Sequence, residues 1–127
     1  MTTSFESDNA GLRIFICVDT GIRCKIGVKQ IALLEAIQAQ GSISGAARAL
    51  SLSYRGARLL IEDVDKILRQ PVVSGVPGGR SGGGATLTPV GTQLILLYRA
   101  IEARAQVVAL AQREALDGLA RTEETNR

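Results

Sequence analysis

The fold is decided by residues 43–62, which read ISGAARALSLSYRGARLLIE. Two helices that cross steeply need a small residue at the crossing, apolar residues inside each helix and one apolar residue in the turn. Ala47 is the small residue, and Leu52 fills the turn, which Ser51 opens where a glycine often stands. The other positions expected to face inward are Ala46, Leu50, Ala57, Leu60, Ile61 and Val64. The pattern predicts a helix-turn-helix.

The outward face of the second of these helices carries Tyr54, Arg55 and Arg58. Arg55 and Arg58 are three residues apart and therefore share one helix face. An arginine can hold the O6 and N7 atoms of guanine with two hydrogen bonds, so this face is suited to reading the major groove of DNA. The alternative is a solvated basic face on a plain helical hairpin.

The helices themselves are indicated by their ends. A first helix is expected from Val28 to a stop at Gly41, a second from about residue 43 to 50, and a third from Tyr54 to about Arg69. Serine oxygens accept the free amide hydrogens of a first helical turn. Ser42 or Ser44 can therefore cap the second helix, and Ser53 the third.

A β-hairpin is expected before the first helix, because apolar and polar residues alternate over 12–26 around a turn sequence. A two-residue loop at Thr20-Gly21 would place Cys17 directly opposite Cys24. The two thiols could then form a disulfide or a redox sensor. Alternatively, they are two small apolar side chains on the buried face of a reduced protein.

A glycine-rich loop separates two short expected strands, 72–76 and 85–88. It lacks the lysine and the Ser/Thr that close a phosphate-binding P-loop, and it contains no Gly-x-Gly-x-x-Gly pattern. A glycine-rich hairpin tip with one arginine suits a wing, in which Arg80 reaches a phosphate or a narrow minor groove. The alternative is a merely flexible loop. Together with the helices, the residues expected to contact DNA are Ser42, Ser44, Ser53, Tyr54, Arg55, Arg58 and Arg80.

A long last helix is expected from Thr88 or Pro89 to about Gly118. It would be roughly 45 Å long, which is more than a small domain needs to cover its core. We therefore expect it to pair two chains, although it could instead fold back on its own domain. The residues expected at the dimer interface are Leu94, Leu97, Tyr98, Ile101, Ala105 and Val108.

Composition limits the function. The 127 residues suit one domain, and the absence of histidine excludes the common histidine-dependent catalytic and metal sites. We expect no enzyme activity, no metal, no cofactor and no membrane segment, and a cytoplasmic location. The net charge is only +3, but the basic residues between Glu35 and Glu62 and between Asp65 and Glu102 are not interrupted by acids, which favours a polyanion as partner.

Four segments resemble a known family. They are 33–37 (LLEAI), 41–47 (GSISGAA), 52–55 (LSYR) and 78–91 (GGRSGGGATLTPVG). They are similar to the amino-terminal DNA-binding domain of molybdate-responsive ModE-type transcriptional regulators, and the second segment and the LTPxG piece are shared with LysR-type regulators. The resemblance implies a winged helix-turn-helix that dimerises through the last helix on a palindromic operator. The carboxy-terminal oxyanion-binding domains usual in the family are not expected here, which leaves room for a separate molybdate-sensing partner.

The sequence thus predicts an α+β, mostly helical fold: a winged helix-turn-helix with a leading β-hairpin and a long carboxy-terminal dimerisation helix. We expect a polar lead-in at 1–11, the DNA-binding and dimerisation domain at 12–118 and a disordered tail at 119–127. The expected function is that of a homodimeric regulator of molybdenum-related genes bound to double-stranded DNA. The alternative is a partner that pairs with a full-length regulator and binds DNA weakly or without specificity.

Overall fold

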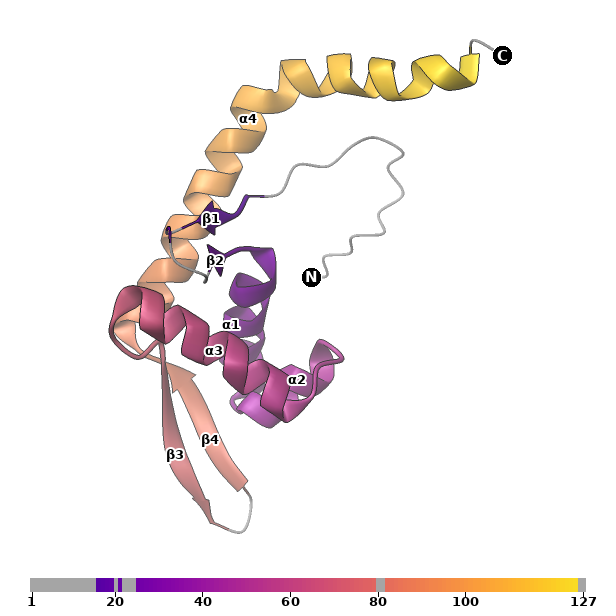
Figure 1. The fold of residues 1–127 in the computed structure, drawn as a ribbon. Coiled ribbons are helices and arrows are strands. Elements are labelled where there is room, and N and C mark those ends of the chain that lie inside the picture. The colour runs from indigo at the N-terminus through magenta and orange to yellow at the C-terminus, as the bar shows by residue number, and fades with distance from the viewer. Residues whose placement is uncertain (1–15, 20, 22–24, 80–81, 126–127) are drawn as a thin grey trace. The chain divides into compact units, whose positions relative to one another are not determined.

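The computed structural model describes residues 16–19, 21, 25–79 and 82–125. The chain divides into two units, of which one is Phe15–Ile101 and the other contributes Glu102–Thr125 of the last helix to the described residues. Within Phe15–Ile101, α1, α2 and α3 pack together, and the β3–β4 hairpin follows α3 (Figure 1). The elements are β1 (Val18–Asp19), β2 (Lys25–Ile26), α1 (Val28–Gln40), α2 (Ile43–Ala49), α3 (Tyr54–Leu68), β3 (Val73–Gly79), β4 (Gly82–Leu87) and α4 (Pro89–Thr125).

The ends of α1 are set by local hydrogen bonds. At its start, the side-chain oxygen of Gln30 accepts the N–H of Gly27 at 2.9 Å. At its end, Gly41 adopts a left-handed conformation with φ of 76°, which glycine reaches without steric cost, and its N–H donates to the carbonyl of Ile37 at 2.8 Å. The predicted boundaries of this helix are confirmed.

The helix-turn-helix is capped as the serines predict. The hydroxyl oxygen of Ser42 accepts the N–H of Gly45 at 2.9 Å and begins α2. That of Ser53 accepts the N–H of Gly56 at 2.9 Å and begins α3. Between them, Ser51 has a φ of 59°, the left-handed conformation for which a glycine is the usual residue.

The core lies between α1, α2, α3 and the start of α4. Ala46, Ala47 and Ala57 let the two helices of the helix-turn-helix approach closely, and all three are buried. Leu52 and Leu60 pack against this core while partly buried. The buried apolar residues are Ile26, Ile31, Leu33, Leu34, Ile37, Ile43, Ala46, Ala47, Ala57, Ile61, Val64, Val72, Ala85, Ile95 and Tyr98.

Two hydrogen bonds attach the hairpin to the helices. β3 and β4 are antiparallel, with Val73 opposite Leu87 at the base. The N–H of Ala85 donates to the carbonyl of Gly41 at 2.9 Å, which joins β4 to the end of α1. A carboxylate oxygen of Asp65 on α3 accepts the N–H of Val72 at 2.9 Å. The hairpin base is therefore anchored to α1 and α3.

The start of α4 is capped by Thr88. Its hydroxyl accepts the N–H of Gly91 at 3.1 Å and donates to the carbonyl of Pro71 at 2.8 Å. Pro89 occupies the first helical position, where its missing N–H costs no hydrogen bond. The helix ends at Thr125, past the predicted end at Gly118, and so includes 119–125, which the sequence predicted to be disordered.

The leading hairpin differs from the prediction. Val18 pairs with Ile26 and Asp19 with Lys25, a register that excludes Cys17 opposite Cys24. A carboxylate oxygen of Asp19 accepts the N–H of Gly21 at 3.0 Å, a side-chain bond typical of a turn.

Of the two cysteines, the described residues include Cys17. The thiol of Cys17 is free and exposed, and its sulfur lies near Gly27: a Cβ added to that glycine would be 3.7 Å from it. Cys24 and most of the predicted first strand lie outside the described residues. The prediction that the two cysteines face each other is wrong.

Leu50 also differs from the prediction. We expected it to face inward from α2, but it is the residue that ends this helix, and 36% of its surface is exposed. Its backbone has left the helical conformation, with φ of −105°, so the helical spacing that placed it beside Ala46 no longer applies.

Candidate nucleic-acid interface

The first turns of α3 present the predicted contact residues to solvent. Tyr54, Arg55 and Arg58 are all exposed, and 53% of the surface of Tyr54 is accessible. The opposite side of the same helix is buried through Ala57, Ile61 and Val64. The burial of one face therefore determines which side chains are available to a ligand.

The two arginines on this face have different surroundings. A guanidinium nitrogen of Arg58 lies 4.0 Å from a carboxylate oxygen of Glu62, with both side chains about half exposed, so this pair holds Arg58 only weakly. Arg55 has no ion-pair partner within the described part of the chain. A planar guanidinium in this position can bind the edge of a guanine or a phosphate oxygen.

The predicted serines fall into two groups. The oxygens of Ser42 and Ser53 already accept backbone N–H groups as helix caps, but a hydroxyl that accepts one hydrogen bond can still donate its own proton to a phosphate. Ser44, in the first turn of α2, is exposed. Arg80, expected at the wing tip, lies outside the described residues.

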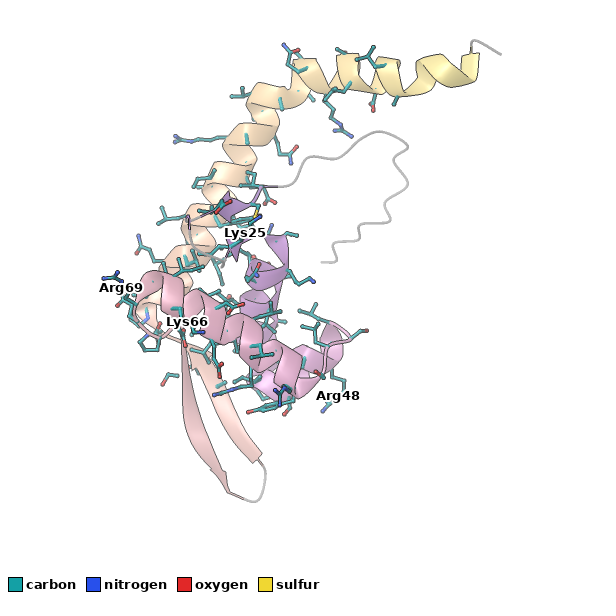
Figure 2. The ribbon with its side chains drawn as sticks, viewed as in Figure 1. Lys25, Arg48, Lys66 and Arg69 are labelled. Atoms are coloured by element: carbon teal, nitrogen blue, oxygen red, sulfur yellow. The ribbon has the colours of Figure 1, made fainter. Side chains whose placement is uncertain are left out.

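Three further basic residues belong to the same part of the chain and were not among the predicted contacts. Arg48 on α2, Lys66 on α3 and Arg69 at the end of α3 are exposed, and Figure 2 shows the last two toward the end of α3 that leads to the hairpin. The acid-poor charge pattern of the sequence was the signal that could have found them. They extend the positive charge beyond Arg55 and Arg58 on the exposed face of α3.

The residues predicted at a dimer interface also fall into two groups. Tyr98 is buried in its own domain, where its hydroxyl donates to the carbonyl of Ile16, and Leu94 packs partly buried against the core. Leu97, Ile101 and Val108 are exposed, and Ala105 is half-buried. Tyr98 thus serves the fold of one chain, whereas three large apolar side chains of α4 face solvent.

An apolar cavity of about 400 Å³ lies between the end of α3 and the start of α4. Leu97 lines it together with Leu68, Val90 and Leu94.

Among the described residues, no helix is long and apolar enough to cross a membrane, and no group of three metal-ligating side chains gathers.

The chain is similar to known proteins both in sequence and in fold. No protein-family model matches the chain. The chain is 50% identical over 84 residues to the molybdenum-pterin-binding protein MopB of Rhodobacter capsulatus, covering 66% of this chain and 30% of that protein. It is 35% identical over 91 residues to the DNA-binding transcriptional dual regulator ModE of Escherichia coli K12, covering 72% of this chain and 32% of that protein.

The fold is similar to that of a LysR family transcriptional regulator of known crystal structure, with a TM-score of 0.50 and 17% identity over 65% of this chain and 27% of the other. This likeness supports the architecture and no more. The chain spans about a third of the length of the curated relatives it matches. It is therefore a winged helix-turn-helix of the kind found in transcriptional regulators, similar in sequence to part of the ModE and MopB proteins.

Proposed function

We propose that the protein is a sequence-specific DNA-binding transcriptional regulator of molybdenum-related genes that binds a palindromic operator as a homodimer. The observation that carries the proposal is the exposed face of α3, on which Tyr54, Arg55 and Arg58 stand in the first turns of the second helix of a helix-turn-helix. In this fold that helix enters the major groove with its amino-terminal residues toward the bases.

The roles of the individual residues follow from their chemistry. Arg55, Arg58 and Tyr54 read bases or flank them, the arginines by binding guanine edges. The hydroxyls of Ser42, Ser44 and Ser53 donate to phosphates, as does Arg80 from the wing. The association with molybdenum rests on the names of the relatives, ModE and MopB, and on the sequence similarity to them.

The proposed homodimer is supported by three exposed apolar side chains of α4, those of Leu97, Ile101 and Val108. Apolar side chains of this size are stabilised when a second copy of the helix covers them. Two copies related by a two-fold axis would present two α3 helices to successive major grooves, about 34 Å apart.

The DNA-binding part is tested by measuring affinity for duplex DNA against salt concentration, for the wild type and for Arg55→Ala and Arg58→Ala. Each substitution is expected to relax the preference for one base pair per half-site. Arg104→Ala, which removes the same charge from an exposed position of α4, is the control and is expected to leave base preference unchanged.

Sedimentation of Leu97→Glu combined with Ile101→Glu tests the dimer. The double variant is expected to be monomeric and to lose most of its affinity for a two-half-site duplex while its helical content is unchanged. A monomeric wild type would contradict the homodimer. Wild-type DNA affinity no better than 10⁻⁴–10⁻⁶ M at physiological salt, together with pairing to a full-length regulator, would favour the interaction-partner function.

A further inference from the structure

Leu59 is an apolar residue that the described part of the fold leaves exposed. It lies in the middle of α3, and half of its surface (50%) is exposed. Within the described part of the chain, it belongs neither to the buried core nor to the partly buried side chains that pack against the core. Its neighbours Leu60 and Ile61 do belong to these sets, so the helix buries two of the three consecutive apolar residues and leaves Leu59 outside.

The helical spacing places Leu59 on the proposed recognition face. Arg55 precedes it by four residues and Glu62 follows it by three, and side chains at these separations are neighbours on a helix surface. Both neighbours are exposed. Leu59 is therefore an apolar member of a face on which Arg55 and Glu62 carry charges.

An apolar side chain on such a face matches one feature of the major groove. The four base pairs present hydrogen-bond donors and acceptors there, and thymine adds the only methyl group of unmodified DNA. Contact between an apolar side chain and this methyl excludes water from both. We propose that Leu59 is a specificity-determining residue that packs on the 5-methyl group of a thymine; this rests on the proposed function.

The position of this thymine relative to the base read by Arg55 follows from helix geometry. Four residues of α-helix correspond to a rise of roughly 6 Å. Base pairs are stacked about 3.4 Å apart, so the rise spans about two of them. The thymine that Leu59 contacts thus lies within about two base pairs of the base contacted by Arg55.

The test uses a duplex that the wild-type protein selects from a random pool, in which each thymine is replaced in turn by deoxyuridine. This change removes the methyl group and keeps every hydrogen-bonding atom of the base. At one position per half-site, the wild type is expected to bind about fourfold more weakly, which corresponds to about 0.8 kcal/mol for one buried methyl group. Leu59→Ala is expected to bind the thymine and deoxyuridine duplexes equally.

Leu50→Ala is the matched control, because it removes another exposed leucine from outside α3 and is expected to keep the fourfold discrimination. If a motif is selected but no deoxyuridine position weakens wild-type binding, or if Leu59→Ala discriminates as the wild type does, the role of Leu59 is overturned and the proposed function stands. If no motif is selected at all, both are overturned.

Discussion

Arg99 on α4 donates two hydrogen bonds to the carboxylate of Glu35 on α1, from Nε at 3.0 Å and from Nη2 at 2.7 Å. The side chains are separated by 64 positions in the sequence, and each is a little more than a third exposed. These two hydrogen bonds join α1 to α4. Beside them, the guanidinium carbon of Arg99 lies 5.9 Å from the centroid of the Tyr98 ring.

The first prediction concerns this pair. Because both groups are partly solvated, a double-mutant cycle with Glu35→Ala and Arg99→Ala is expected to give a coupling energy of about 0.5–1 kcal/mol. Urea unfolding of the four proteins measures it. The coupling should shrink in 1 M NaCl because salt screens charge pairs. A coupling of zero at low salt would show that the Glu35–Arg99 pair does not help to hold α4 against α1.

The second prediction uses two glycines of α4. A Cβ at Gly91 would lie 2.3 Å from the carbonyl oxygen of Val72, which is backbone and cannot turn aside. Gly91→Ala is therefore expected to lower the free energy of unfolding by about 1–3 kcal/mol. Gly118→Ala is the control in the same helix, because a Cβ there meets no atom within 4 Å. It is expected to stabilise the helix by about 0.5–1 kcal/mol, and a loss of stability in this variant would contradict the helical state of 118.

The third prediction concerns the turn of the helix-turn-helix. Ser51 has a φ of 59°, which costs an L-residue roughly 1–2 kcal/mol and costs glycine much less. Ser51→Gly is expected to raise the free energy of unfolding by up to about 1 kcal/mol, because the gain is reduced by the greater entropy of glycine in the unfolded chain. Ser51→Ala removes the hydroxyl but keeps the strain, so it should bring no gain. Equal stability of all three proteins would indicate that the turn is unstrained.

These elements differ in how well the sequence predicts them, for physical reasons. Helix ends depend on local chemistry, so Gly41, Ser42 and Ser53 locate them correctly. The register of the β1–β2 hairpin depends instead on which residue is the first to pair with β1 after the turn. The side chain of Asp19 closes that turn onto Gly21, which the alternation of residues cannot show.

The candidate site was predicted in the same uneven way. The exposed face of α3 follows from which residues are apolar, so the exposure of Tyr54, Arg55 and Arg58 was predicted correctly, while their contact with DNA stays a prediction. The packing of Tyr98 against its own domain was not found, because a helical stripe does not reveal whether it faces a second chain or the core. Leu59 was placed neither among the inward-facing positions nor among the contact residues, because the sequence pattern does not show that half of this apolar side chain is exposed.

The fourth prediction concerns the acidic residue on the recognition face. Glu62 lies near Arg58 and would approach the phosphates with it. Its carboxylate repels a phosphate, and attracts Arg58 away from one, with an energy of about 1 kcal/mol at 4 Å in water. Glu62→Gln is therefore expected to raise affinity for non-specific duplex DNA about fivefold at low salt, measured by fluorescence anisotropy.

Glu114→Gln makes the same change of net charge on α4 and serves as its control. A gain of equal size in both variants would mean that only net charge matters. That result would contradict a specific approach of α3 to the DNA.

Selection from a random-sequence duplex pool by the wild-type protein tests most directly whether α3 reads DNA sequence. We expect enrichment of a two-fold symmetric motif whose half-sites are centred about one helical turn apart, and loss of base preference within each half-site in Arg55→Ala. Binding that falls steeply with salt but enriches no motif would contradict it, because contacts to phosphates alone produce affinity without sequence preference.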